Sequence, residues 1–224
     1  MDKINNIKEV EYLVNDLNQQ DLLRPFSKNI LEFTTSLSSK FLSQEISTTY
    51  PELTVLGFWL RKSNIQKIKL DFEKKIVKKN LVPRGLVFQI PPSNVNSIFI
   101  YSWILSLLAG NKNIVRVSYK KSEQMNLICN ILEEILIDKK WIEIKKRNKF
   151  ITYEYEDEIN NYLSINCDTK VVWGGDRTVD KMRTFKQKPH ATEINFPDKI
   201  SISIINYDEY MKLKDDQKLK LIEK

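Results

Sequence analysis

The sequence predicts an α/β fold in which a parallel sheet carries helices on both faces and is preceded by N-terminal helices. Three observations predict this class. From residue 83 onward, short apolar runs of strand length alternate with longer segments whose apolar residues have helical spacing. The connections between them are only a few residues long, and proline or glycine follows several of the runs. Such alternation is typical of a parallel sheet that is covered on both faces.

The first 82 residues predict a helical segment that packs on the core. Apolar residues recur at helical spacing over residues 4–17 and 21–45. Pro51 starts a third helical stretch, which ends in a basic run. We therefore expect residues 1–82 to form an N-terminal segment that lies against the sheet.

Residues 83–206 predict the α/β domain itself. Pro91-Pro92 stops the first strand, Ser93 or Asn94 caps the helix that runs on to residue 108, and Gly110 ends that helix. The expected strands are residues 85–90, 113–118, 150–155, 169–173 and 200–205. The later helices are expected at residues 122–137, 156–163 and 176–185. Residues 207–224 are charged and predict a linker or the start of a further domain.

Length and composition exclude several classes of protein. The chain has 224 residues, of which 42% are hydrophobic and 29% charged, as in an ordinary globular protein. The longest apolar stretch, residues 98–109, falls short of the roughly 20 residues that a membrane span needs, and the N-terminus has no apolar signal-peptide region. With only Cys129 and Cys167, a reduced cytoplasmic location is expected.

The net charge of +7 is a weak indication of function. Lysine, isoleucine and asparagine are frequent throughout the chain, so the charge is typical of a compositional bias. A polyanion-binding protein that uses residues 74–79 and 139–149 is one alternative, but nucleic acid is not the partner we expect. His190 is the single histidine, and with two cysteines the chain offers too few ligands for a structural zinc site.

The end of the first predicted strand carries the first candidate site. A stiff bend leads from this strand into a helix, and it consists of Ile90, Pro91, Pro92, Ser93 and Asn94. The free N–H groups at such a helix start suit a phosphate or a developing oxyanion, and the Asn94 amide could donate to the same anion. Asn94 could equally be no more than the helix cap.

Two further strand ends carry unusual residues. Arg116 lies near the end of the second strand, followed by Ser118, and could bind a ribose or phosphate or pair with a carboxylate. Gly174, Gly175 and Asp176 lie between a strand and a helix, where two glycines let a ligand approach the backbone closely. In an open parallel sheet, the carboxyl ends of the strands lie at one edge, and ligands bind there. We therefore expect all three segments to meet in one crevice at that edge.

These segments together resemble the LuxC-type acyl-CoA reductases, a branch of the aldehyde dehydrogenase superfamily. The similarity is longest over residues 83–118 and is also found in residues 57–64 and 172–176, so that it covers roughly residues 50–205. It implies a Rossmann-like NAD(P)-binding domain of the aldehyde dehydrogenase type. It also implies a reaction in which a cysteine thiolate attacks a fatty acyl-CoA thioester, CoA leaves and hydride reduces the acyl-enzyme to an aldehyde.

The resemblance assigns roles to individual residues. Asn94 matches the side chain that stabilises the oxyanion, and Arg116 matches a lysine that holds the adenosine ribose. The helix opening at Gly174, Gly175 and Asp176 matches the part that receives the pyrophosphate. Residues 90–93 and Ser118 are expected beside them in the cofactor site. The implied cofactor is NADPH, with NADH left open, and no metal is implied.

The sequence departs from the family pattern at the nucleophile. Cys129 has the position of a core residue, and Cys167 stands beside Asp168, which would raise the pKa of its thiol. The family's catalytic cysteine would follow Lys224, and the general-base glutamate of aldehyde dehydrogenases would fall near Asn195. We therefore expect this chain to bind nucleotide without turning over alone. It would be the cofactor-binding part of the enzyme, in a homo-oligomer or with a partner that carries the catalytic domain. The alternative is an inactive regulatory module that pairs with a full-length relative.

Overall fold

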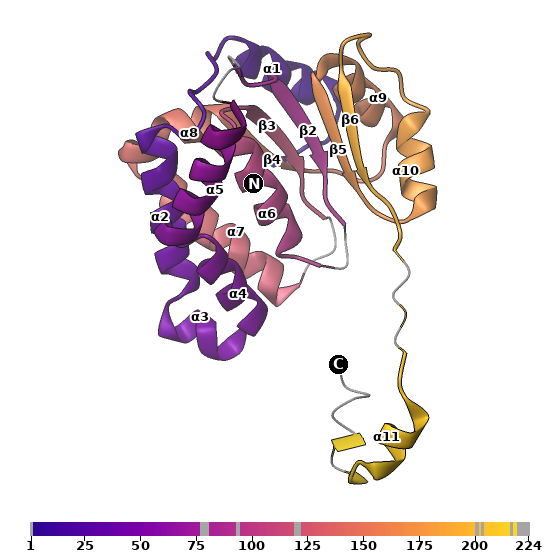
Figure 1. Cartoon of the computed structure of the whole chain (residues 1–224). Helices are drawn as coiled ribbons and strands as arrows, with labels where there is room; N and C mark the ends of the chain where they lie inside the picture. The colour runs from indigo at the N-terminus through magenta and orange to yellow at the C-terminus, as the bar shows by residue number, and fades with distance from the viewer. Residues whose placement is uncertain are drawn as a thin grey trace.

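The computed structural model describes residues 2–76, 81–92, 95–118, 122–199, 202, 204–215 and 217–218. In these residues the strands form one six-stranded sheet in the order β1-β4-β3-β2-β5-β6, and every neighbouring pair is parallel (Figure 1). The predicted α/β class is confirmed. The strands are β1 (Asp2–Lys3), β2 (Leu86–Ile90), β3 (Lys112–Arg116), β4 (Asn148–Thr152), β5 (Thr169–Trp173) and β6 (Thr192–Phe196).

Helices cover both faces of this sheet, as predicted. The helices are α1 (Ile7–Asn18), α2 (Lys28–Phe41), α3 (Gln44–Thr49), α4 (Pro51–Trp59), α5 (Lys62–Ile76), α6 (Ile98–Leu108), α7 (Glu123–Leu136), α8 (Ile142–Arg147), α9 (Asp157–Asn166), α10 (Asp176–Arg183) and α11 (Tyr207–Lys212), with a 3₁₀ turn at Lys139–Trp141. One core packs the seven helices from α2 to α8 against the face of the sheet that holds Val115 and Phe150. The other joins α1, α9 and α10 to the face that holds Ile114 and Val172. Ile114 and Val115 serve opposite cores because successive side chains of a strand point to opposite faces.

The strand order reverses beside β2. The chain runs from β2 through α6, β3 and α7 to β4 on one side, and α9 then returns it to β5 on the other side of β2. The connections that leave β2 and β5 therefore diverge at the carboxyl edge of the sheet. In open α/β sheets such a switch point forms the ligand-binding crevice.

The final strand was predicted in the wrong place. The sixth strand is β6, and it pairs with β5 over Thr169↔Thr192 to Trp173↔Phe196. Ile202 and Ile204 lie outside any strand and are 82% and 93% exposed, while residues 200, 201 and 203 lie outside the described part. The true strand was missed because Glu193 and Asn195 interrupt its apolar pattern.

The helix after β2 begins later than its predicted cap. α6 starts at Ile98 with Ser97 in the N-cap position, so neither Ser93 nor Asn94 caps it, and both lie outside the described residues. A turn closed by the bond from the Ile98 N–H to the Val95 carbonyl precedes the helix. At the N-terminus, the helix predicted from residue 4 starts at Ile7, because Asn6 caps it and the Ile4 N–H donates to the Thr152 carbonyl at 2.9 Å, next to the pairing of Asp2–Lys3 with β4.

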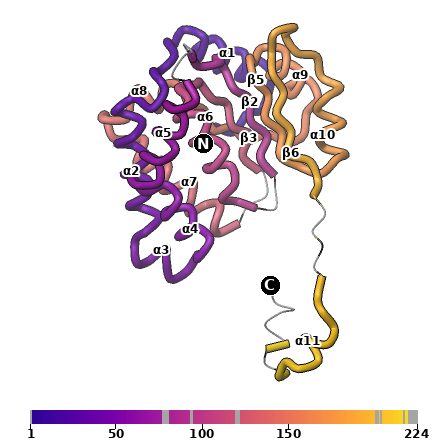
Figure 2. The backbone as a smooth tube through the Cα atoms, viewed as in Figure 1, coloured from indigo at the N-terminus to yellow at the C-terminus, as the bar shows by residue number. Residues whose placement is uncertain are grey.

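The last described helix lies away from the sheet. α11 contains no buried residue, and Figures 1 and 2 show it separated from the rest of the molecule. None of the helices in the described ranges is long and apolar enough to cross a membrane.

Candidate functional site at the carboxyl edge of the sheet

The structure brings the three predicted segments to the same edge of the sheet. β3, β2 and β5 are adjacent and parallel, and they end at Arg116, Ile90 and Trp173. Their registers are close, since Gln89 pairs with Val115 and Ile90 pairs with Val172. The bends that follow these strands therefore lie around the switch point.

The first segment is described only in part. Ile90 is buried, whereas Pro91 and Pro92 are half-buried at the start of the bend. Ser93 and Asn94 lie outside the described residues, so the oxyanion role of the Asn94 amide stays a prediction.

Aromatic rings hold the Arg116 side chain in the second segment. Its guanidinium carbon lies 4.7 Å from the ring centroid of Tyr153 and 5.6 Å from that of Tyr155. Tyr153 is fixed in turn, because it is buried and its hydroxyl donates to Asn160 Oδ1 at 2.8 Å. Burial raises the pKa of Tyr153, against the opposing effect of the Arg116 charge, so the ring stays neutral. Among the described residues no carboxylate pairs with Arg116, and Ser118 lies half-buried two positions further on.

In the third segment, Gly174 and Gly175 stand where a side chain would collide with its neighbours. Gly175 is the N-cap of α10 with φ of −60°, so an ordinary residue could adopt its backbone conformation. A Cβ atom on Gly174 would lie 3.0 Å from the Cβ of Thr178, and one on Gly175 would lie 2.9 Å from Asp198 Oδ2. Side chains at these two positions would collide with Thr178 and Asp198, so the packing at the start of α10 favours glycine at both.

Sequence analysis missed a second feature of this edge. Trp173 stacks on Phe196 with ring centroids 3.7 Å apart and planes 10° from parallel. The Trp173 indole N–H donates to Ser102 Oγ at 3.2 Å, and that hydroxyl donates to the buried Gln89 Oε1 at 2.7 Å. These bonds fix the orientation of the indole at the crevice. The only signal in the sequence was an aromatic residue directly before a Gly-Gly bend.

An apolar groove runs from this aromatic pair across the face of the sheet. It has a volume of about 440 Å³ and lies beside α6, over β5 and β6. Leu105, Val171 and Ile194 line its middle, and Arg84 and Thr192 close the far end. The groove therefore adjoins the crevice at the carboxyl edge of the sheet.

A buried ion pair anchors α10. Lys170 Nζ donates to the Met182 carbonyl at 2.6 Å and pairs with Glu193 Oε2 at 2.9 Å. Burial by itself would raise the pKa of Glu193, but hydrogen bonds from Asn195, Lys170 and Arg183 and the charge of Lys170 outweigh it and lower the pKa. Because Glu193 is engaged beneath α10, it is a poor candidate for a general base at the carboxyl edge.

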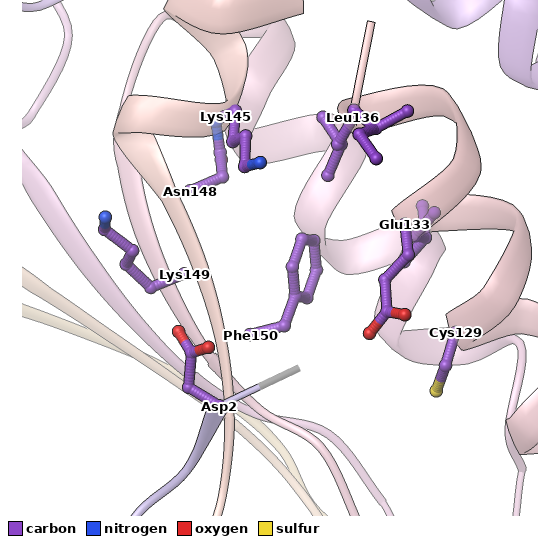
Figure 3. Close-up of a pocket in the computed structure, with 10 residues that line it drawn as sticks. Asp2, Cys129, Glu133, Leu136, Lys145, Asn148, Lys149 and Phe150 are labelled. Carbon is purple, nitrogen blue, oxygen red and sulfur yellow. The ribbon is translucent and has the colours of Figure 1, made fainter.

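A separate cavity of about 390 Å³ lies at the far side of the sheet, between β4 and α7 (Figure 3). Its wall carries Lys149 and Asp2 on one side and Glu133 and Cys129 on the other. Lys149 pairs with Asp16 at 2.7 Å. None of the predicted site residues lines this cavity, so it is not part of the candidate site.

Neither cysteine has the properties of a nucleophile. Burial raises the pKa of both thiols, Cys129 and Cys167, to about 11. Cys167 is buried and precedes β5, so it lies at the amino edge of the sheet, opposite the crevice. Within the described ranges no three His, Cys, Asp or Glu side chains are grouped to hold a metal ion.

Several solved structures share the fold of this chain. NADP-bound glyceraldehyde-3-phosphate dehydrogenase GapN of Methanocaldococcus jannaschii matches with a TM-score of 0.57 and 13% identity, over 86% of this chain and 47% of that one. Staphylococcus aureus AldH matches with a TM-score of 0.52 and 15% identity, over 86% and 46%. A variant of Bradyrhizobium japonicum proline utilization A matches with a TM-score of 0.58 and 14% identity, over 86% and 22%. This chain thus spans about half or less of their length.

The family model for acyl-CoA reductase (LuxC) matches residues 63–219, which include the crevice segments. No curated protein sequence is significantly similar to the chain. The matched residues make up more than half of the chain, and the structural neighbours share the expected dehydrogenase fold. This protein therefore belongs to the LuxC acyl-CoA reductase family.

Proposed function

We propose that this chain binds a nicotinamide dinucleotide at the carboxyl edge of its sheet. It would form the cofactor-binding part of an NADPH-dependent oxidoreductase that reduces a fatty acyl-CoA to an aldehyde. The observation that carries the proposal is the Gly174-Gly175 bend, which joins β5 to the start of α10 beside the switch point. That bend lies within the residues that the family model matches.

The residues at this edge fit a dinucleotide. The backbone N–H groups of the first turn of α10 and the positive end of its dipole suit the pyrophosphate, and the two glycines place no side chain of their own between the ligand and this backbone. Trp173 offers an oriented aromatic wall beside that position. The bend at Ile90, Pro91 and Pro92, which follows the neighbouring strand β2, would lie on the other side of the dinucleotide.

Arg116 would bind the adenosine ribose, together with Ser118. The guanidinium is held over Tyr153 and no described carboxylate neutralises it, so its N–H groups can donate to a ribose hydroxyl or to a 2′-phosphate. This supports NADPH as the cofactor, with NADH as the alternative. When bound, the nicotinamide supplies the hydride.

The nucleophile in this proposal is a cysteine outside the 224 residues. A thiolate would displace CoA from the acyl thioester, and the resulting acyl group would be reduced and released as an aldehyde. Asn94 would donate its amide to the oxyanion. We propose that the cysteine is carried by a catalytic domain, in the same polypeptide or in a partner chain. Neither Cys129 nor Cys167 forms a disulfide in the described part of the chain, and reduced cysteines are typical of the cytoplasmic setting that we propose.

Isothermal titration of the chain with NADPH and NADH tests the proposal. We expect binding, and we expect the Arg116→Ala variant to bind more weakly. Arg61→Ala is the matched control, because Arg61 also stacks on an aromatic ring, Phe58 at 3.9 Å, but lies on the N-terminal helical segment. No heat of binding for either nucleotide at millimolar concentration in folded protein would refute the proposal.

A second candidate is a module that pairs with a full-length relative without catalysing a reaction. The observation that favours it is the open apolar groove over β5 and β6, since apolar surface of this kind is often covered by a partner. Light scattering distinguishes the two states: a monomer that binds nucleotide supports the first function, and self-association without nucleotide binding supports the second.

A further inference from the structure

We propose that Asp198 competes with the pyrophosphate for the start of α10 and so lowers the affinity of the site for dinucleotides. This inference rests on the proposed function. It concerns a residue at the carboxyl edge that sequence analysis did not single out.

The Asp198 carboxylate contacts the N-terminus of α10. Its Oδ2 atom accepts a hydrogen bond from the Asp176 N–H at 3.2 Å. The same oxygen lies 2.9 Å from the point where a Cβ atom on Gly175 would stand, and Oδ1 lies 3.3 Å from it. The carboxylate therefore fills the space that the glycine leaves open.

The fold explains how Asp198 reaches this place. β6 pairs with β5 up to Trp173↔Phe196, and the Gly174 N–H donates to the Phe196 carbonyl at 3.2 Å. This bond holds the two strand ends together, so the residues after Phe196 pass directly over the start of α10. The position of Asp198 follows from the strand register.

The N-terminus of α10 favours one bound anion and disfavours a second one beside it. Its dipole favours a negative charge in the first turn, and the Asp176 side chain already supplies one there. In the structure Asp198 takes the hydrogen bond that a phosphate oxygen would need. A dinucleotide must displace this carboxylate, which is exposed and can turn into water. The displacement weakens binding without preventing it.

Titration calorimetry with NADPH on the full chain tests this inference. We expect Asp198→Asn and Asp198→Ala to bind NADPH about threefold more tightly than the unchanged protein, since a carboxylate at a helix start contributes a modest free energy. Inorganic pyrophosphate should show the same gain, and adenosine, which carries no phosphate, should show none. Asp180→Asn is the matched control, because it removes an exposed carboxylate of α10 that pairs with Arg183 at 3.7 Å, away from the opening.

The possible outcomes separate this inference from the proposed function. Equal or weaker NADPH binding by both Asp198 variants overturns the inference alone. Tighter binding by Asp180→Asn to the same degree also overturns it, because the effect would then be one of net charge. If no protein in the series binds either nucleotide, the proposed function fails and the inference fails with it. Circular dichroism of each variant verifies that it is folded.

Discussion

Removing the charge of Glu193 should destabilise the protein more than removing its partner. Lys170 is fully buried, and Glu193 Oε2 at 2.9 Å is the charged group that compensates it. The Glu193→Gln variant keeps the shape but leaves the ammonium in the core without a counter-charge. Losing one partner of a buried ion pair lowers the free energy of unfolding by about 3–5 kcal/mol. Because the Glu193 side chain is 18% exposed, water partly solvates the pair, and we expect a loss near the lower value, about 3 kcal/mol.

The reciprocal change should cost less. Lys170→Met replaces the ammonium with an apolar chain of similar length, and Glu193 keeps its bonds to Asn195 and Arg183 at a partly wet position. We expect a loss of about 1–2 kcal/mol. The double variant should lie close to Lys170→Met, because the uncompensated charge is then gone.

Urea unfolding followed by circular dichroism measures these differences. The order of stability should be wild type, then Lys170→Met and the double variant, then Glu193→Gln. A Glu193→Gln variant as stable as the wild type, or a double variant that loses the sum of both single effects, would refute the argument that the pair is a coupled buried unit.

Three further predictions concern the bend, the carboxylates and the thiols. Gly174→Val should weaken NADPH binding at least about tenfold in calorimetry, because its side chain would meet Thr178 and fill the approach to α10; unchanged affinity would count against the site. Burial opposes ionisation of Asp168, but bonds from Lys188 and the Leu86 N–H outweigh it and lower its pKa. Its stabilisation is therefore present above the unfolded value near 3.8 and lost as the pH falls through the lower folded value, so Asp168→Asn should flatten the acid limb of a stability profile. Cys129 and Cys167 should react with a thiol reagent at pH 8 only slowly in the folded state, since with pKa values of about 11 roughly one thiol in a thousand is ionised; rapid labelling of native protein would contradict their burial.

The elements with strong local patterns could be predicted from the sequence. β5 lies at the predicted residues 169–173, and α7 begins beside its predicted start at residue 122, where the Ser122 hydroxyl caps it by accepting from the Met125 N–H at 3.1 Å. In both cases the residues that decide the structure are neighbours in the chain. Local propensity and tertiary structure therefore agree there.

The elements that depend on distant partners could not be predicted. β6 contains Glu193 because Lys170 compensates it across the sheet, and β1 is a strand because the edge of β4 accepts Asp2 and Lys3. The same limit applies to the candidate site. The Gly-Gly bend was visible in the sequence, whereas the stacking of Phe196 and the contact of Asp198 follow from the strand register.

A crystal structure of the chain grown with NADP⁺ tests the central claim most directly. The account predicts pyrophosphate density against the backbone of Gly175 and Asp176, the adenosine ribose within reach of Arg116, and the Asp198 side chain turned away. Nucleotide bound in the cavity between β4 and α7, or at the amino edge of the sheet, would contradict it.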